Sequence, residues 1–388
     1  MKIKKIRLKN FRNYEDLELI PHQSVNLFFG QNGSGKTNLL EAIHYCALGK
    51  SHRVSHDRNT VMIGQEFGAC GIELERINSD CNIAVKMIPG DNTSKTIFID
   101  KKKIYKLSEL MGRLQCVIFS PEDLELIREG PSVRRRYIDM LLSQISVPYF
   151  VALQQYRKAM EQRNAILKKM KYHEDVDSMM IEEFERAMIR PAQVIIPERA
   201  KYIEILNQYA SACYCSISGR ENEKLTIEYQ TSVKSGNIEE SFVEGFRRNL
   251  KEDILTGNTS FGPHRDDLQI RLNGKSMKLY ASQGQVRTAA LSMKLAQLHL
   301  YKDVTGDTPI LLLDDVMSEL DMTRRIRLLK EIENVQTFVN CTDQSDLEEC
   351  EDKRVYRVQL DENNHASISL ITSGSTENET LFFEPDFT

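Results

Sequence analysis

Short runs of apolar residues in the first third of the chain predict β-strands. Residues 1–29 alternate apolar with charged positions, as a half-exposed strand does, and turn near Pro21. The run Val25–Phe29 is largely apolar and indicates a buried strand. Further strands are expected at 69–74, Cys81–Ile88, 96–99 and Cys116–Phe119, with turn clusters such as 89–92 between them.

Helical periodicity replaces the strand pattern at Gly130, and Ser132 is a suitable first residue of a helix. The helix-rich segment continues to about Cys215. One of its faces carries an apolar stripe, which indicates packing against a core rather than a binding surface: Leu153, Tyr156, Met160 and Leu167.

Helix-breaking residues interrupt this segment. The polar stretch 172–178 predicts a turn. Because proline lacks a backbone N–H, we expect a helix over 179–188 to break near Pro191. A further helix is expected from Pro197 to about Ala212.

Strand patterns return at Leu225, and 289–301 has the period of an amphipathic helix. From Asp361 onward the chain is acidic and rich in Ser and Thr, and 382–387 is an aromatic and acidic run near its end. This composition favours a loosely packed terminus, partly disordered, over a docking peptide.

Composition narrows the class of protein without identifying its chemistry. The chain has 388 residues, of which 41% are hydrophobic and 28% charged, as in globular proteins. No apolar run approaches the roughly 18 residues that cross a bilayer, and the first residues lack the apolar core of a signal peptide. Eight scattered cysteines without a C-x-x-C pair favour reduced thiols and give no zinc pattern. We therefore expect a cytoplasmic protein with no membrane association.

The net charge of −4 gives no global sign of a nucleic-acid partner. Basic residues do cluster locally, although each cluster by itself is typical of a solvated face. The clusters are Lys2/Lys4/Lys5/Arg7/Lys9/Arg12, Lys50/His52/Arg53/Arg58, Arg134/Arg135/Arg136 and Lys168/Lys169/Lys171.

A phosphate-binding loop is the strongest chemical signal in the chain. It fits G-x-x-x-x-G-K-[ST] and consists of Gly30, Gln31, Asn32, Gly33, Ser34, Gly35, Lys36 and Thr37. The glycines let backbone N–H groups close around phosphate oxygens, Lys36 offers a cation to the β- and γ-phosphates, and the Thr37 hydroxyl can ligate Mg²⁺. A strand before the loop and a helix after it place the positive helix end at the phosphates. The motif predicts binding of a nucleoside triphosphate with Mg²⁺.

Two adjacent acids follow a second apolar strand at 310–313. Asp314 is placed to hold the metal directly or through water, and Asp315 to orient or deprotonate the attacking water. Two adjacent carboxylates repel each other, and a bound cation offsets this repulsion. The pair therefore favours a metal-binding site over a residue that only caps a loop.

A third element precedes a helix expected to begin near Val286. It consists of Ser282, Gln283, Gly284 and Gln285. A hydroxyl, a flexible backbone and a helix N-terminus suit phosphate, although Ser and Gly are also ordinary capping residues. The three elements in this order, followed by 318–321, resemble ABC-type ATPases. In that family the Ser-x-Gly-Gln loop contacts a partner subunit's γ-phosphate, so the resemblance implies an ATP-dependent homodimer.

The spacing of the motifs points to one family. About 245 residues separate Thr37 from Ser282, more than in transporter ATPases, and the long coiled coil of SMC proteins is missing. The chain closely resembles the RecF recombination mediators of bacteria. The resemblance is carried by 8–14, 30–37, 47–53, 119–124, 130–139, 162–165, 261–267, 282–285 and 311–321.

The resemblance implies an α/β fold: an ABC-type ATPase head, with a P-loop core of mixed and antiparallel sheets, and an inserted helical lobe. We accordingly divide the chain into four segments. These are the N-terminal half of the head (1–130), the inserted helical, arm-like DNA-binding lobe (131–220), the C-terminal half of the head (221–360) and the acidic tail (361–388).

The resemblance also implies a function in recombinational repair, replication and the SOS response. Such a protein binds ATP, Mg²⁺ and single-stranded or gapped DNA without sequence specificity, and hydrolyses ATP slowly, with DNA stimulation, as a switch. It acts with RecR and RecO to load RecA.

Some assignments stay open. Residues 339–344 contain no histidine where ABC-type ATPases often carry a γ-phosphate sensor, and Asp315 is one methylene shorter than the usual Glu. Gln115 and Glu122 both remain as counterparts of the family's loop glutamine, and His264 and Arg265 fit a structural turn as well as a site. Two alternatives also remain: an SMC-like or nuclease-associated head that pairs with a second polypeptide, and a non-catalytic ATP-gated interaction module.

Overall fold

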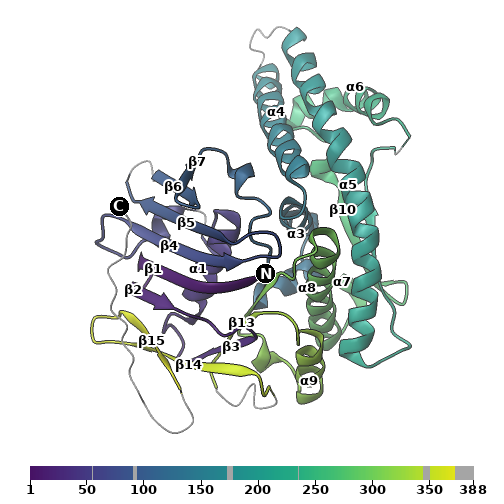
Figure 1. Cartoon of the computed structure of the whole chain (residues 1–388). Helices are drawn as coiled ribbons and strands as arrows, with labels where there is room; N and C mark the ends of the chain where they lie inside the picture. The colour runs from purple at the N-terminus through teal and green to yellow at the C-terminus, as the bar shows by residue number, and fades with distance from the viewer. Residues whose placement is uncertain (55, 91–93, 173–177, 235, 344–349, 372–388) are drawn as a thin grey trace. The chain divides into compact units, whose positions relative to one another are not determined.

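The computed structural model describes residues 1–54, 56–90, 94–172, 178–234, 236–343 and 350–371 (Figure 1). The chain forms two compact units, one from Met1–Asp123 with Tyr301–Thr388 and the other from Leu124–Leu300. The four functional segments expected from the sequence stay a prediction. No described helix is both long and apolar enough to cross a lipid bilayer.

The first unit contains an antiparallel sheet in the order β2-β1-β4-β5-β6-β7. Cross-strand pairing of alternating residues buries one face of β1, which explains the alternation seen in the sequence. The strands are β1 (Lys2–Phe11), β2 (Tyr14–Leu19), β4 (Gly68–Glu75), β5 (Cys81–Ile88), β6 (Ser94–Ile99) and β7 (Lys102–Ile104).

The second sheet of this unit has the order β15-β14-β3-β13-β12-β8 and is parallel except for β15. Its strands are β3 (Val25–Phe29), β8 (Cys116–Phe119), β12 (Ile310–Asp314), β13 (Thr337–Cys341), β14 (Lys353–Leu360) and β15 (Ala366–Leu370). Helix α1 (Lys36–Leu48) packs against strands of both sheets and is therefore buried on most of its surface. Helix α9 (Met322–Glu331) and the 3₁₀ turns η1 (Asp57–Thr60), η2 (Leu107–Glu109) and η5 (Met317–Glu319) complete the unit.

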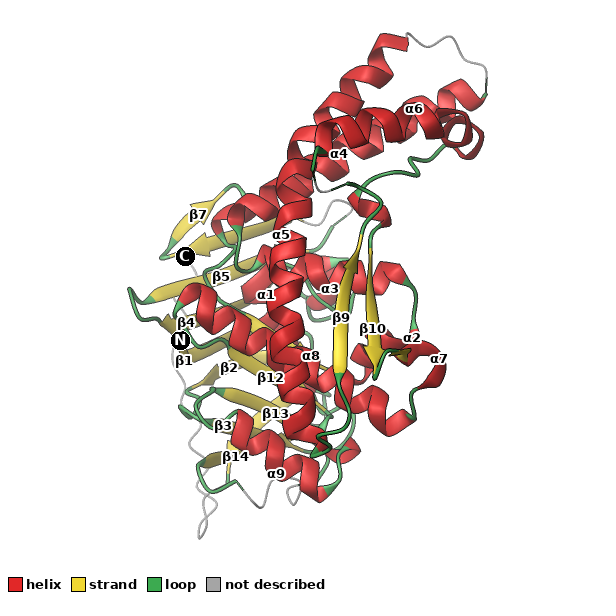
Figure 2. Cartoon of the chain, turned by 90° about the vertical axis from the view of Figure 1, so that its right-hand side faces the viewer, coloured by secondary structure: helices red, strands yellow, loops and turns green. Residues whose placement is uncertain are grey.

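The second unit combines helices with the small antiparallel sheet β11-β10-β9, whose strands β9 and β10 lie side by side in Figure 2. The strands are β9 (Leu225–Gln230), β10 (Asp267–Leu272) and β11 (Lys275–Ser276). The helices are α2 (Glu125–Arg128), α3 (Pro131–Ser143), α4 (Val147–Lys171), α5 (Ser178–Ser218), α6 (Ile238–Thr256), α7 (Met277–Tyr280) and α8 (Gln283–Thr305), with the turns η3 (Pro121–Leu124) and η4 (Pro263–Arg265). Helix η3 begins, and α8 ends, in residues of the first unit.

The expected strands Val25–Phe29, Cys81–Ile88 and Cys116–Phe119 are confirmed, and 69–74 and 96–99 lie within β4 and β6. The apolar stripe on α4 is confirmed as core, since Leu153, Tyr156 and Leu167 are buried.

The expected helix break near Pro191 is wrong, because α5 continues through both Pro191 and Pro197. Ala192, Ile195 and Ile196 around these prolines are buried, and α5 packs along α4 (Figure 1). Tertiary packing therefore outweighs the hydrogen bonds that the prolines cannot make.

Three further differences concern element boundaries. Helix α6 was not expected, and α8 begins at Gln283 rather than near Val286. Strand β15 lies inside the tail that was expected to pack loosely, because it pairs with β14. The expected turn residues 173–177 and the aromatic run 382–387 lie outside the described residues.

Candidate functional site

The carboxyl ends of four parallel strands bring the predicted nucleotide-binding residues of the first unit to one sheet edge. Asp314 pairs with Asn340, Leu313 with Phe119, and Cys341 with Phe29. The phosphate loop continues from β3, and Asp315 follows β12 at the same edge. This edge is where ligands bind in open α/β sheets.

The backbone of the phosphate loop has the conformation that its glycines allow. Gly33 has φ 82° and Gly35 has φ 112°, in the region that side chains with a Cβ rarely adopt. A Cβ on Gly35 would also lie 2.8 Å from the amide atoms of Asn13. The three loop residues Gln31, Asn32 and Gly33 are exposed, so their backbone is open to a ligand.

Lys36 is buried and folded onto its own loop. Its Nζ donates to the carbonyl oxygens of Gly30 at 2.7 Å and Gln31 at 3.0 Å. Burial lowers the pKa of Lys36, while Asp315 and Asp314 act in the opposite direction. A phosphate group would give this ammonium the counter-charge that two neutral carbonyls do not supply.

Asp314 joins three elements through a single carboxylate oxygen. Its Oδ1 accepts hydrogen bonds from Thr37 Oγ1 and from Asn340 Nδ2, both at 2.8 Å. Burial raises the pKa of Asp314, the two hydrogen bonds lower it, and the charge of Asp315 raises it further. Asp315 itself is partly exposed and has φ 52°, a strained backbone conformation for a residue with a Cβ.

The donor set at this edge fits Mg²⁺. A hydroxyl and a carboxylate oxygen that lie 2.8 Å apart are hard oxygen ligands, and a cation would relieve the repulsion between the two adjacent acids. Thr37 and Asp314 are therefore the residues that would hold the metal.

The turn between β1 and β2 supports the phosphate loop and was not recognised as part of the site. Asn13 Nδ2 donates to the Ser34 carbonyl at 3.3 Å, and Asn13 Oδ1 accepts from Asn38 Nδ2 at 2.8 Å. The Tyr14 hydroxyl donates to the Gly35 carbonyl at 3.1 Å. These residues stood in the family-like stretch 8–14, which is the signal that could have found them.

Glu41 of α1 is a second unexpected member of the site. Its carboxylate is fully buried and accepts from Arg12 Nε at 2.9 Å and Nη2 at 2.6 Å. The Ser51 hydroxyl donates to the same carboxylate at 2.6 Å. The basic loop after α1 consists of residues 50–53. Its Arg53 Nη1 donates to Asn38 Oδ1 at 3.0 Å, which holds the loop against the first turn of this helix.

His52 belongs to the same basic loop. Its ring lies edge-on to His44, with the ring centroids 4.7 Å apart. Burial lowers the pKa of His52, while the charges of Glu41, Asp314 and Glu122 counteract this effect. His52 therefore interacts electrostatically with both Asp314 and Glu122.

The choice between Gln115 and Glu122 follows from strand direction. Gln115 precedes β8, at the opposite edge of the sheet from Asp314, and its Nε2 donates to the Gly112 carbonyl at 3.0 Å. Glu122 follows β8 in η3, at the edge that carries the phosphate loop. Glu122 is therefore the candidate for the position of the family's loop glutamine.

The Ser282–Gln285 element lies in the second unit and is not part of the unit that holds the phosphate loop. The Gln285 N–H donates to Ser282 Oγ at 3.3 Å, and the Ser282 N–H donates to Gln285 Oε1 at 2.9 Å. This reciprocal pair is a capping box at the start of α8, and Gln285 Nε2 also donates to Glu223 at 3.0 Å. Ser282 and Gln283 stay exposed.

The basic residues of β1 do not form a bare cationic stripe. Lys5 lies 2.8 Å and Arg7 3.1 Å from Glu18, and Lys9 lies 2.9 Å from Asp16. These cross-strand ion pairs favour the structural interpretation of this cluster.

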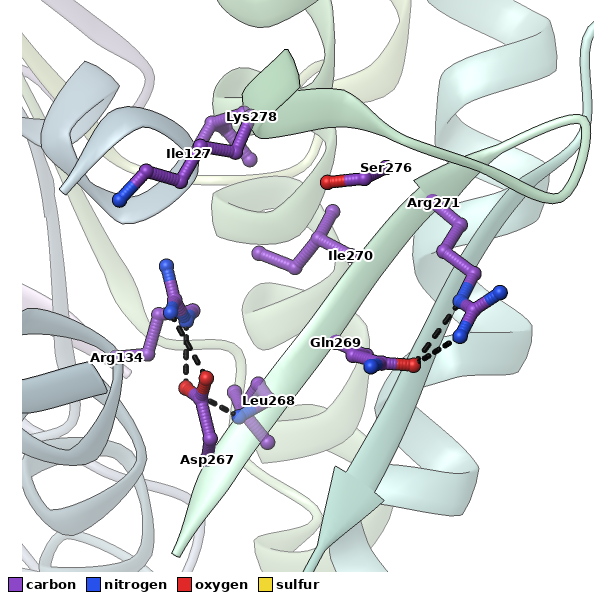
Figure 3. Close-up of a pocket in the computed structure, with 9 residues that line it drawn as sticks. All are labelled: Ile127, Arg134, Asp267, Leu268, Gln269, Ile270, Arg271, Ser276 and Lys278. Atoms are coloured by element: carbon purple, nitrogen blue, oxygen red, sulfur yellow. Dashed lines mark hydrogen bonds and ion pairs between the residues drawn. The ribbon is translucent and has the colours of Figure 1, made fainter. Parts of the chain in front are cut away.

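Arg134 of the second unit is also paired. Its guanidinium forms a bidentate ion pair with Asp267, with Nε donating to Oδ1 at 2.7 Å and Nη2 to Oδ2 at 2.9 Å (Figure 3). The pair borders a cavity of about 250 Å³ between α2, α3, α7, β10 and β11. Arg134 therefore has a structural role in the described part of this unit.

The run 261–267 behaves as a structural turn. His264 Nδ1 lies 2.9 Å from the Tyr156 hydroxyl and Nε2 lies 2.8 Å from the Thr259 carbonyl. Burial lowers the pKa of His264 to about 4, so the ring is neutral at pH 7. Arg199 donates to the Pro263 carbonyl at 2.6 Å and to Asp266 at 2.9 Å. These buried contacts favour the structural alternative for His264.

Comparison with known proteins gives a consistent result. Residues 2–367 match the model of the RecF/RecN/SMC N-terminal domain. The chain is 40% identical over 361 residues to the DNA replication and repair protein RecF of Clostridium perfringens strain SM101, covering 92% of this chain and 98% of that protein. It is also 40% identical over 351 residues to RecF of Clostridium botulinum strain Alaska E43, covering 90% and 95%.

Solved structures agree with this match. A structure of the recombination mediator protein RecF with ATP, in the RecFOR pathway, has a TM-score of 0.86 at 34% identity and covers 96% of this chain and 98% of that one. An Smc head bound to the C-winged helix domain of ScpA has a TM-score of 0.57 at 14% identity and covers 96% of this chain and 98% of that one. This second similarity concerns the fold only.

Proposed function

The chain belongs to the RecF family of DNA replication and repair proteins, and from this premise we propose that it is an ATP-dependent DNA-binding switch. In this proposal, ATP with Mg²⁺ binds the first unit. Two copies then enclose the nucleotides, and the dimer holds single-stranded or gapped DNA without sequence specificity. With RecO and RecR it aids the loading of RecA.

One observation carries the proposal: the phosphate loop, Thr37 and Asp314 converge at a single sheet edge, with the Thr37 hydroxyl 2.8 Å from the Asp314 carboxylate. The exposed loop backbone suits the phosphates, and Lys36 supplies the positive charge. Mg²⁺ would neutralise the charge of the β- and γ-phosphates. The solved structure of a RecF relative with ATP supports the choice of nucleotide.

The position of the Ser282 element supports the dimer. Ser282 is exposed at a helix start, in the unit that does not contain the phosphate loop. In a dimer this hydroxyl would donate to the terminal phosphate bound by the partner. Hydrolysis and phosphate release would remove that charge-assisted contact and open the dimer.

We assign slow hydrolysis to the residues near the γ-phosphate position. Asp315 would orient or deprotonate the attacking water, and its short side chain limits its reach. The stretch 339–344 contains no histidine, which related ATPases often have there, and within it the Asn340 amide donates to Asp314. These two features support slow ATP hydrolysis, whose role is to limit the lifetime of the dimer.

Sedimentation with and without ATP, each with gapped DNA present, tests the proposal. ATP should convert the monomer to a dimer that co-sediments with the DNA, and raising the salt concentration should weaken DNA binding steeply. A protein that stays monomeric with ATP, or that dimerises only with a different polypeptide, would contradict the proposal. The second result would favour an SMC-like or nuclease-associated head.

A further inference from the structure

Two sequence runs that the proposed function does not use, 130–139 and 261–267, meet at one cavity of the second unit. This cavity has a volume of about 180 Å³. Ser132, Arg135 and Arg136 line it from α3, Arg157 from α4, Arg199 from α5 and His264 from η4. Its walls therefore come from helices that are far apart in the sequence.

The cavity carries an excess of positive charge. Arg157 and Arg199 share the carboxylate of Asp139, each at 2.8 Å, and Arg199 also contacts Asp266 at 2.9 Å. By formal charge, the described lining residues carry four guanidinium groups and the carboxylate of Asp139, and the carboxylate of Asp266 adjoins the cavity through Arg199. The difference of four positive and two negative charges leaves an excess of two.

The positive charge of Arg135 has a neutral group as its hydrogen-bond acceptor. Its Nη1 donates to the backbone carbonyl of Asp266 at 2.7 Å, a neutral acceptor. Burial lowers the pKa of Arg135, and repulsion from Arg199 and Arg265 adds to this effect, although Asp267 and Asp266 counteract it. An anion in the cavity would offset both the burial and the repulsion.

The cavity combines a fixed floor with an accessible rim. The Arg199 side chain is 2% exposed and is held by hydrogen bonds to Tyr149, Pro263, Asp266 and Asp139. At the rim, Arg157 is 56% exposed, and Ser132 and Arg136 are exposed as well. The volume is below the roughly 300 Å³ typical of sites for whole small molecules, so it suits a single oxyanion group.

We propose that this cavity binds one phosphate group of a nucleic-acid backbone, with Arg136 and Arg157 as the rim contacts and Ser132 as a hydroxyl donor. The assignment rests on the proposed DNA binding and gives it a location in the second unit. Guanidinium groups present several N–H donors in a plane, which matches the oxygens of a phosphodiester. The neutral His264 closes one wall and adds no charge.

The test compares a double variant, Arg136→Ala with Arg157→Ala, against the parent in titrations of a labelled gapped duplex with ATP at several salt concentrations. We expect about tenfold weaker binding, and a smaller dependence of log affinity on log salt by about one to two phosphate contacts. Inorganic phosphate should compete with DNA for the parent more strongly than for the variant. Affinity for ATP and ATP-dependent sedimentation should not change.

Arg186→Ala is the matched control. Arg186 lies on α5 of the same unit, is 78% exposed, and forms an ordinary ion pair with Glu182 at 3.2 Å. It should retain both the affinity and the salt dependence of the parent. Arg136→Glu is a second test that leaves the Arg157–Asp139 pair intact, and it should weaken DNA binding more than Arg136→Ala.

Several outcomes would overturn the assignment. The double variant could bind DNA like the parent, or phosphate could bind the parent without affecting DNA, which would make this a site for the free ion only. If the double variant lost binding to an acidic protein while its DNA affinity stayed unchanged, the cavity would be a protein-recognition surface instead. A parent that dimerises with ATP yet binds no DNA would remove the DNA part of the proposed function and this site with it.

Discussion

The hydroxyl of Thr37 donates to Oδ1 of Asp314 across 2.8 Å, although 277 positions separate the two residues in sequence. The bond joins the first turn of α1 to the end of β12. The two residues assigned to the metal are therefore held next to each other by a contact within the protein itself, and such preorganisation lowers the cost of binding a ligand.

Asp314→Asn tests the metal-binding role. Asparagine keeps an oxygen that can accept the Thr37 hydrogen bond, but it removes the negative charge that a divalent cation requires. We expect affinity for a fluorescent ATP analogue to fall at least tenfold with Mg²⁺ and to change little with EDTA. Equal losses in both conditions would point to damage to the fold rather than to the metal site.

Lys36→Ala tests the link between nucleotide binding and association. The ammonium is the one assigned cation of the phosphate loop, so its removal should abolish measurable ATP binding and ATP-dependent dimerisation in sedimentation. Thermal unfolding without nucleotide should stay close to that of the parent. A dimer that still forms with ATP would exclude the enclosed-nucleotide model.

Asp315→Asn tests the assignment of the water-activating residue. The amide cannot accept a proton from water, so turnover measured by phosphate release should fall about 100-fold. ATP-dependent dimerisation should persist and last longer, because the nucleotide stays intact. Hydrolysis at the parent rate would show that another group activates the water.

Glu41→Ala tests the buried anchor of the basic loop. The substitution leaves the Arg12 guanidinium without its carboxylate partner in a largely buried position, and the free energy of unfolding should decrease by about 3 kcal/mol in urea titrations. Lys9→Ala, which removes an ion pair at the surface, is the comparison and should cost less than about 1 kcal/mol. Similar small losses for both variants would contradict a buried anchor.

The pKa of His264 predicts a specific dependence of stability on pH. The pKa is about 4 in the folded protein and about 6.5 when unfolded, so the unfolded chain binds the proton first as the pH falls. This contribution to stability is fully present above pH 6.5 and is lost as the pH falls from 6.5 to 4. At pH 5 the loss relative to neutral pH is about 2 kcal/mol.

His264→Gln provides the comparison for this effect. The free energy of unfolding should decrease less between pH 7 and pH 5 in the variant than in the parent, whatever the variant's stability at pH 7. The same decrease in both proteins would show that His264 stays accessible to protons in the folded state.

The local parts of the site could be predicted from the sequence because their signals are local. The glycine pattern of 30–37 and the apolar strand before Asp314 each occupy fewer than ten consecutive residues. Strand direction then brings them to the same sheet edge. The helix through Pro191 was missed for the opposite reason, since the contacts that stabilise it come from α4.

The supporting residues depend on contacts between distant segments. Asn13 lies in the family-like stretch 8–14 and Asn340 in the stretch 339–344, but their roles, like that of Glu41, follow from their partners Ser34, Asp314 and Arg12. The charge clusters, which the sequence alone favoured as solvated faces, also have partners in distant segments. The β1 lysines look cationic in sequence, but neighbouring strands supply the acids that neutralise them.

Asn340 also bears on how the protein would respond to acid. An amide neither gains nor loses a proton between pH 5 and 8, whereas a histidine in its place would become positively charged in that range. The Asn340 amide is therefore a donor whose charge does not change on mild acidification, and any change of charge in this pair comes from Asp314, whose pKa is raised by burial.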